Sequence, residues 1–332
     1  MPDFEDGHTG GCHCGAIRYR TVRHHGNAWI CNCHFCQHMT GGPFLVEHCF
    51  TRDEIEVTRG APATYTHISS GSGKEVYLQL CDQCGSHLFL TLERWPDTQN
   101  IFTTTLDDPG AVGYGPDTLR YLFLDAAQSA TVIPAGFEAF DGHAEPADGS
   151  GPRRHVFDTA FMATPSDPGT GPHTGGCLCG DLRYVVDGPL DDVVICHCRS
   201  CQMALGSGEN HEILVDPDRF RVTRGKARRY RHAGGSGQAL DRRFCGRCGT
   251  ALWLTGARFS EIGLFRGTLD RPNRVAVNAA TAIQICLDEA LPSAMVRAGI
   301  AAYPQHRRAP DGTIQAPRFY DRPWRIGDGP PA

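Results

Sequence analysis

The sequence lacks long apolar runs, an excess of basic residues and a hydrophobic N-terminal segment. No apolar run approaches the ~20 residues that span a bilayer, and the polar, acidic start has no signal-peptide centre. Lys and Arg number 32 against 37 Asp and Glu, for a net charge of −5, which argues against nucleic acid as a partner. We therefore expect a soluble, cytoplasmic protein with reduced thiols that binds no membrane and can form a homo-oligomer.

The sequence also lacks any long segment with the 3.6-residue apolar period of an amphipathic helix. Short segments with β-type alternation or apolar runs, bounded by turn residues, occur instead. They lie at 16–21, 54–58, 74–80, 87–92 and 119–124, and again at 181–186, 220–223, 239–244, 251–255 and around 283–287. This pattern predicts a mainly β fold.

Cysteine is abundant, with 16 in 332 residues, and in a reducing compartment this indicates bound metal rather than disulfides. A shift of the chain against itself by 165 residues, with one deletion near residues 69–70, superimposes fourteen of them. The matched pairs are Cys12/Cys177, Cys14/Cys179, Cys31/Cys196, Cys33/Cys198, Cys36/Cys201, Cys81/Cys245 and Cys84/Cys248. Cys49 and Cys286 fall on Leu214 and Tyr121 and are interpreted as small buried hydrophobic residues. Such agreement indicates a duplicated domain.

The duplication predicts a domain organisation. We expect zinc domains at 8–146 and 173–306, joined by a linker at 147–172 that is rich in Gly, Pro, Asp and Ser. A Pro/Gly-rich tail follows at 307–332, in which the aromatic residues near its end can attach it to a surface. These aromatic residues are Phe319, Tyr320 and Trp324.

Two short cysteine pairs in each copy fit one four-ligand zinc site. Each pair supplies one edge of a tetrahedron, and the glycines next to the pairs allow the backbone to turn tightly around a metal. The sets are Cys12, Cys14, Cys81 and Cys84 in the first copy and Cys177, Cys179, Cys245 and Cys248 in the second. With four thiolates, such a site has no free position for substrate and joins the start of each domain to its later hairpin.

Three cysteines remain in each copy, with the spacing Cys-x-Cys-x-x-Cys. They are Cys31, Cys33 and Cys36 (the first trio) and Cys196, Cys198 and Cys201 (the second trio). Three protein ligands plus an exchangeable position is the arrangement of a catalytic zinc. A zinc ion held by three thiolates is a weak Lewis acid but suits a fourth thiolate, from a substrate, that must stay deprotonated near neutral pH. The trios are therefore the candidate catalytic residues, and we expect up to four Zn²⁺ per chain.

Other interpretations of the trios stay open at this point. A nearby histidine can close the site as a fourth ligand, the candidates being His34 and His38 in the first copy and His197 and His211 in the second. A Cys-x-x-Cys pair can instead act as a redox dithiol. Iron also fits thiolate-rich tetrahedral sites.

Three further polar residues recur in both copies, as the pairs Arg18/Arg183, Glu47/Glu212 and His67/His232. The arginines precede a strand tyrosine and are interpreted as solvated or ion-paired, with carboxylate binding as the alternative. The glutamates are interpreted as surface carboxylates, with a proton shuttle as the alternative. The histidines are interpreted as structural, and a position facing the open zinc is the alternative.

At these motifs the sequence resembles the glutathione-dependent formaldehyde-activating (GFA)/CENP-V family. The resemblance rests on the Gly-Gly-Cys-x-Cys-Gly opening at 10–15 and 175–180, the central trio and the closing Cys-x-x-Cys-Gly, which matches most closely at 244–250. It covers about 8–146 and 173–305 and implies a β-tent type zinc fold, with the outer pairs as structural ligands and the trio as the catalytic zinc site. It also implies a carbon–sulfur lyase that reversibly joins glutathione and formaldehyde into S-hydroxymethylglutathione.

The two copies differ around the trios. The second trio has small or polar neighbours that fit the family pattern, whereas Phe35 interrupts the first, and Pro43 and Phe44 stand in place of Gly208 and Glu209. This difference favours the second copy as the working site. The main rival function is a non-catalytic zinc scaffold that binds a partner through its paired domains, as CENP-V suggests for the family. A third is a zinc-dependent acceptor of a different small molecule.

Overall fold

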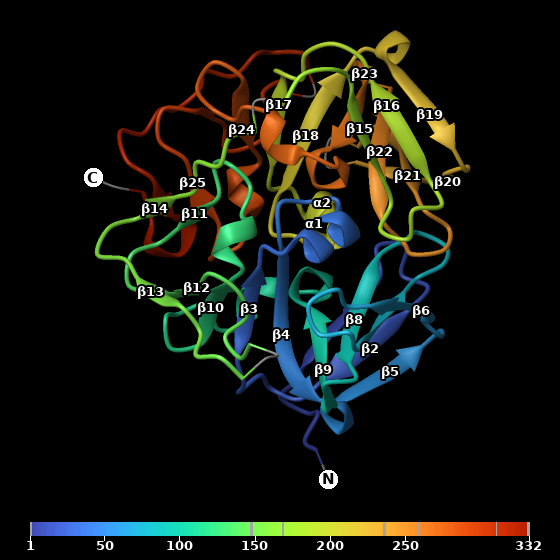
Figure 1. Cartoon of the computed structure of the whole chain (residues 1–332), viewed down its shortest axis with the longest axis vertical. Helices are drawn as coiled ribbons and strands as arrows, with labels where there is room; N and C mark the ends of the chain where they lie inside the picture. The colour runs from blue at the N-terminus through green and yellow to red at the C-terminus, as the bar shows by residue number, and fades with distance from the viewer. Residues whose placement is uncertain are drawn as a thin grey trace.

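The computed structural model describes residues 2–146, 149–167, 169–234, 237–257, 259–309 and 311–330. The chain forms two β-sheet halves that lie against each other, the first below and the second above in Figure 1. Each half has one large sheet and one three-stranded sheet, so the predicted mainly β fold is confirmed. No helix within the described residues is long and apolar enough to cross a membrane.

The large sheet of the first half has nine strands in the order β13-β12-β10-β3-β4-β9-β8-β7-β6, and β1, β2 and β5 form its small sheet. The bounds are β1 (His8–Gly11), β2 (Arg18–Thr21), β3 (Ala28–Cys31), β4 (Leu45–Thr51), β5 (Ile55–Arg59), β6 (Ala63–Ile68), β7 (Glu75–Leu80), β8 (His87–Leu92), β9 (Trp95–Phe102), β10 (Leu119–Leu122), β12 (Glu138–Phe140) and β13 (Arg154–Val156).

The large sheet of the second half has eight strands in the order β20-β21-β22-β23-β18-β17-β24-β26, with β15, β16 and β19 as its small sheet. The bounds are β15 (His173–Gly176), β16 (Arg183–Val186), β17 (Val193–Cys196), β18 (Asn210–Val215), β19 (Phe220–Arg224), β20 (Arg228–Ala233), β21 (Ala239–Phe244), β22 (Ala251–Gly256), β23 (Phe259–Phe265), β24 (Ala282–Ile285) and β26 (Ala301–Ala302). Read from β26, this order repeats that of the first half from β12, so the duplication is visible in the topology.

The burial of the strands explains why the sequence forms them. Residues of β7 alternate between half-buried and buried, as expected for a strand with one face on the core. The late strands β10 and β24 end earlier than predicted, at Leu122 and Ile285. The next residues, Phe123 and Cys286, have left-handed backbones with φ of 57° and 60°, which is incompatible with strand geometry.

Two short helices, α1 (His34–Thr40) and α2 (Arg199–Leu205), were not predicted, because seven residues are too few to display a helical period. Each begins inside a trio, where the side chain of Cys33 or Cys198 accepts a hydrogen bond from the backbone N–H three residues later. Short 3-10 turns complete the chain: η1 (Arg52–Glu54), η2 (Thr103–Thr105), η3 (Pro109–Ala111), η4 (Leu124–Ala126), η5 (Pro217–Arg219), η6 (Arg266–Thr268), η7 (Pro272–Arg274), η8 (Leu287–Glu289) and η9 (Ile326–Asp328).

The ends of the two helices form part of the contact between the halves, and α1 and α2 lie together at the centre of Figure 1. Gly41 and Gly206 end them with φ of 78° and 77°. The Gly41 carbonyl oxygen accepts from the Gly267 N–H at 2.9 Å, and the Gly206 carbonyl oxygen accepts from the Val46 N–H at 3.1 Å. A side chain at Gly206 would collide with Phe102, so both the backbone angle and the close approach require glycine.

Buried arginines of the second half bind the first half between its η4 turn and β11 (Val132–Ile133). Arg266 donates to Ser129, at 3.0 Å to its carbonyl oxygen and 2.6 Å to its hydroxyl. Arg297 donates to the Ala130 carbonyl oxygen at 2.7 Å and pairs with Glu209. Each buried guanidinium needs hydrogen-bond acceptors from both halves, so the two halves pack as one unit.

Part of the predicted linker and of the tail forms β-structure. Within 147–172, β13 pairs with β12, and β14 (Phe161–Met162) pairs with β11, while residues 147, 148 and 168 lie outside the described part of the chain. In the tail, β27 (Trp324–Arg325) pairs with β25 (Met295–Val296), beside β11 and β14 in Figure 1. The expected attachment of the tail is therefore confirmed, whereas the domain boundaries themselves stay a prediction.

Candidate functional site

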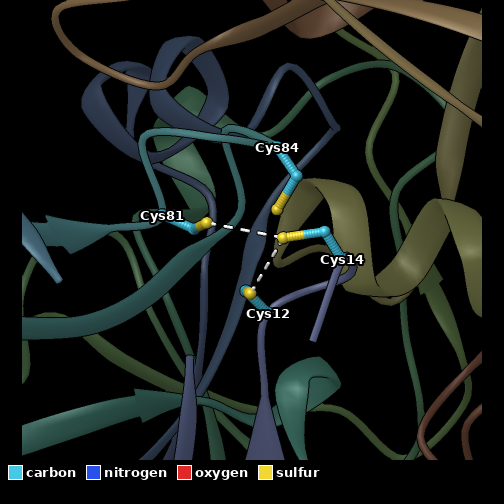
Figure 2. A group of neighbouring side chains, drawn as sticks. All are labelled: Cys12, Cys14, Cys81 and Cys84. Carbon is cyan, nitrogen blue, oxygen red and sulfur yellow. Dashed lines mark hydrogen bonds between the residues drawn. The ribbon is translucent and has the colours of Figure 1, made fainter. Parts of the chain in front are cut away.

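The two four-cysteine sets come together as their spacing predicts. In the first half, Cys12 and Cys14 precede β2 and the other pair lies in the β7–β8 turn, and all four thiols converge (Figure 2). The sulfur of Cys14 lies 3.5 Å from that of Cys12 and 3.7 Å from that of Cys81. These separations match the edge of a tetrahedron with zinc–sulfur bonds of about 2.3 Å, whose sulfurs lie about 3.8 Å apart. The donor set therefore fits a closed, four-thiolate metal site.

The second half repeats this arrangement. The sulfur of Cys179 lies 3.4 Å from that of Cys177 and 3.6 Å from that of Cys245. All four ligand atoms of the set, which Cys248 completes, lie within 4.8 Å of one another. Each set joins the start of its half to a hairpin some seventy residues later, as expected from the sequence.

The two trios also come together, each at the point where a strand passes into a short helix. The first trio lies at the end of β3 and the start of α1, and the second at the end of β17 and the start of α2. The three sulfurs of each trio lie within 4.8 Å of one another. In the described part of the chain, no other Cys, His, Asp or Glu joins either set of three. Each trio thus fits a metal ion that retains one open position.

The histidines that could have closed the trios lie elsewhere. His34 is exposed on α1, and His38 is on the same helix outside the trio. His211 Nε2 contacts Glu209 Oε1 at 2.9 Å, and His197 Nε2 lies 3.8 Å from Glu209 Oε2. The closed-site interpretation is therefore not supported by the described residues.

The interpretation of Cys286 as a plain hydrophobic residue is incomplete. Its side chain is buried, but it packs beside Cys196 and Cys198, and its thiol interacts with both. His306 Nδ1 lies 3.7 Å from the Cys286 sulfur. Cys49 accepts a hydrogen bond from Trp29 Nε1 at 2.9 Å, which agrees with a packing role.

The sequence register for Cys286 was wrong by two positions. Glu47 pairs with Phe102 and Glu212 with Phe265, which shows that the β22–β23 hairpin has lost a further residue relative to β8–β9. Cys286 consequently corresponds to Phe123, not Tyr121, and these two residues share the same left-handed backbone.

The second trio lines a cavity of about 320 Å³, which lies in the size range of small-molecule sites. Its walls are mostly apolar, with contributions from β21, β22, β23 and β24. The polar residues that reach it include Glu212, His232, Arg242 and His306. Three thiols that could hold a metal ion, an apolar wall and a few polar groups are therefore brought to one place.

The first trio is surrounded by larger apolar side chains. Trp29, Phe35, Met39 and Phe123 all pack in the cluster that contains Cys31 and Cys36. The corresponding residues of the second half are smaller: Val194, Ser200, Ala204 and Cys286. The ring of His67 contacts that of Phe35 at a tilt of 35°, with centroids 4.9 Å apart, whereas its counterpart His232 lines the second cavity. The predicted divergence of the two trios is thus reflected in what packs around them.

The two recurring glutamates are buried, so their interpretation as surface carboxylates was wrong. They lie on β4 and β18, central strands whose residues are covered on both faces. Burial raises the pKa of Glu47 to about 7 and that of Glu212 to about 8, and the Cys33 and Cys198 thiols add to the effect. Asn100 donates to Glu47 at 3.0 Å, while the second half has Gly263 at that position. Glu212 therefore has the properties of a proton donor beside the second trio.

The recurring arginines are ion-paired, which agrees with their interpretation as solvated or ion-paired residues. Arg18 forms a two-point ion pair with Asp107, and Arg183 forms the equivalent pair with Asp270. Neither of them lines the cavity of the second trio.

Contacts from the first half hold the helix of the second trio. Arg199, between two trio cysteines, donates to the carbonyl oxygens of Thr104 and Leu106. His13, between two cysteines of the first four-cysteine set, contacts the Ser200 hydroxyl and the Tyr230 hydroxyl, both at 3.0 Å. Sequence reasoning missed these contacts, because nothing in a single copy indicates which surface the other copy covers.

A duplicated β fold with a four-thiolate and a three-thiolate centre in each half defines a tandem cysteine-rich, metal-binding class of protein. The chain belongs to the family described as glutathione-dependent formaldehyde-activating enzyme, whose family model matches residues 7–122 and 172–285. The two matched regions contain the two copies of all seven repeated cysteines, so the resemblance found in the motifs is confirmed.

A curated protein and a solved structure each align with about a third of the chain. A Halomonas elongata protein, provisionally named a glutathione-dependent formaldehyde-activating enzyme, is 30% identical over 101 residues. That match covers 30% of this chain and 64% of the relative. A crystal structure of a Rhodobacter sphaeroides protein aligns with 34% of this chain and 98% of its own, at 20% identity and a TM-score of 0.26.

Proposed function

We propose that the protein is a zinc-dependent enzyme of the carbon–sulfur lyase type that reversibly joins a thiol to a small aldehyde. Glutathione and formaldehyde are the proposed substrates, in keeping with the family. The observation that carries the proposal is the second trio, a set of three thiols without a fourth ligand among the described residues, which opens on a cavity of about 320 Å³. Cytoplasmic localisation stays a prediction.

In this proposal the cysteines have two roles. The two four-cysteine sets hold structural zinc ions, which leave no position for substrate, and each trio holds a zinc ion with one open position. A zinc ion bound by three thiolates supplies a place for a substrate thiolate and keeps it nucleophilic near neutral pH. The second trio is the working site, because small side chains surround it and a cavity leads to it.

Glu212 moves the proton. The new bond forms between the thiol sulfur and the aldehyde carbon, and the carbonyl π electrons pass to the oxygen. Glu212, neutral near pH 7 because burial raises its pKa to about 8, donates its proton to that oxygen. The resulting carboxylate then accepts the proton of the next thiol, so the cycle is balanced, and the reverse sequence releases thiol and aldehyde.

A screen of thiol and aldehyde pairs tests the proposal, with adduct formation followed by NMR. We compare the wild type with Cys198→Ser and with the matched variant Cys33→Ser in the first trio. We expect Cys198→Ser to abolish turnover and Cys33→Ser to retain most of it. Equal turnover by all three proteins would exclude catalysis at the trios. Failure of every pair, with metal bound, would favour the scaffold function instead.

A further inference from the structure

We propose that Arg242 forms an anion site in the second cavity, which selects a thiol that carries a carboxylate group. The proposal rests on the proposed function for the position of the thiol, and it adds the chemical class of the substrate and the residue that recognises it. Arg242 lies on β21 opposite Leu254 of β22, and it lines the cavity together with the second trio.

The guanidinium of Arg242 is buried without an acidic partner. The residue is 2% exposed, and its Nε and Nη1 atoms have no hydrogen-bond partner among the described residues. Its Nη2 atom lies 3.4 Å from the Ser200 carbonyl oxygen and 3.3 Å from His232 Nε2. The neighbouring acid in the sequence, Asp241, lies 3.9 Å and 3.7 Å from Arg229 and Arg231 instead.

A buried cation with two unpaired donors is unfavourable unless a ligand supplies negative charge. Burial lowers the pKa of Arg242, whereas Cys201, Cys84, Tyr230 and Cys198 raise it. These groups of the protein therefore supply part of the negative charge. The first trio, however, has the same cysteine spacing as the second. The residue that corresponds to Arg242 there is Leu78, which is apolar and fully buried. A cation is therefore no general requirement of such a trio, and the arginine of the second half is available for a ligand.

The rest of the cavity has the charge expected for an anionic ligand. Arg307 and Arg308 also line it, together with His306. Among the described residues that line the cavity, Glu212 is the only acidic one. Arg307 and Arg308 are exposed, so their attraction for a carboxylate acts partly through solvent. The apolar walls beside the buried Arg242 exclude water and strengthen its attraction.

These observations fit one binding mode. The substrate thiol occupies the open position at the second trio, and a carboxylate of the same molecule pairs with the guanidinium of Arg242. The guanidinium turns towards the cavity for this contact, because its Nε and Nη1 atoms are shielded in this structure. Glutathione belongs to this class, as do smaller mercapto acids. Neutral thiols such as 2-mercaptoethanol do not.

Binding of S-methylglutathione to the zinc-loaded full chain tests the anion site without any reaction. This probe keeps both carboxylates of glutathione but has no free thiol. By titration calorimetry we expect wild type and the matched variant Arg243→Met to bind it, and Arg242→Met to bind about tenfold more weakly or worse. Arg242→Lys, which keeps the charge, is expected to recover part of the affinity. Absence of binding to wild type, or equal binding to Arg242→Met, would overturn the proposal.

Kinetics with two kinds of thiol provide the second test. For glutathione and 3-mercaptopropionate, we expect Arg242→Met to raise KM about tenfold with little change in kcat. For 2-mercaptoethanol, kcat/KM should change less than about twofold, because no carboxylate is lost. An equal loss for both classes would show that Arg242 only balances the charge of the trio, and would refute the carboxylate site. If S-methylglutathione bound with the expected dependence on Arg242 but no thiol were turned over, the anion site would be supported and the proposed reaction refuted.

Discussion

His13 of the first half and Ser200 of the second half are in hydrogen-bond contact, with 3.0 Å between Nε2 and the hydroxyl oxygen. His13 lies between two cysteines of a four-cysteine set, and Ser200 lies between two cysteines of the second trio. The contact therefore connects the structural centre of one half to the proposed catalytic centre of the other. Together with the buried arginines at the interface, it makes the tandem arrangement part of the site itself.

This contact predicts that His13→Ala lowers both the stability of the chain and turnover at the second trio. Loss of the contacts to Ser200 and Tyr230 should destabilise the chain by about 1–2 kcal/mol, and turnover should fall several-fold as α2 becomes less well held. Melting curves and adduct formation measure both effects.

The equivalent residue of the second half provides the control. Leu178 packs at the edge of the cluster around the first trio, so Leu178→Ala should reduce stability but leave turnover nearly unchanged. A larger loss of turnover in Leu178→Ala than in His13→Ala would contradict the assignment of the working site to the second trio.

Removal of Cys286 is predicted to leave the metal content unchanged. The Cys286 thiol lies near Cys196 and Cys198 but outside the set of three sulfurs that lie within 4.8 Å of one another. Metal analysis of purified protein should find about four zinc ions per chain in wild type and in Cys286→Ala, and about three in Cys198→Ser. If Cys286→Ala also lost one ion, Cys286 would be a fourth ligand and the second site would be closed to substrate.

Glu212→Gln is predicted to remove a pH dependence of stability. Burial raises the pKa of Glu212 from its ordinary 4.5 to about 8, so the carboxyl is protonated in the folded chain and ionised in the unfolded chain between these values. The stabilisation of the fold by the neutral Glu212 carboxyl is fully present below pH 4.5 and is lost as the pH rises towards 8. The free energy of unfolding changes by about 1.4 kcal/mol per pH unit in this range.

Melting temperatures at several pH values between 5 and 8 measure this effect. The difference between Glu212→Gln and wild type should grow in favour of the variant as the pH rises. The exposed Glu5 offers a control, since Glu5→Gln should follow the wild type throughout. A constant difference between Glu212→Gln and wild type would show that Glu212 does not titrate as described. Turnover should also decline above about pH 8 in wild type as the proton donor ionises.

The cysteine sets were predictable from the sequence, because metal geometry restricts the spacing within each pair and the repeat showed which pairs belong together. Even the meeting of Cys14 with Cys81 followed from this reasoning. The strands were predictable where their apolar residues alternate or run together, as in β8, which has the predicted bounds.

Other parts of the site depend on packing that the sequence does not reveal. Glu212 is polar, yet it lies on a central strand, so its burial overrides the usual preference of a carboxylate for the surface. Arg242 is likewise charged yet buried, and His13 acquires its role only when one half covers the other. Cys286 was misplaced by two positions because the deletion near residues 69–70 and the further residue lost in the β22–β23 hairpin each shift the register by one.

The central claim is that the second trio holds a metal ion with an open position for a substrate thiolate. The most direct measurement uses the Cys33→Ser chain loaded with cobalt(II), so that the first trio contributes little to the spectrum. On addition of glutathione, we predict that thiolate-to-cobalt charge-transfer absorption increases by about one thiolate per chain, and that the same addition to the double variant Cys33→Ser/Cys198→Ser produces no such increase. An unchanged spectrum of the Cys33→Ser chain at saturating glutathione would contradict the account.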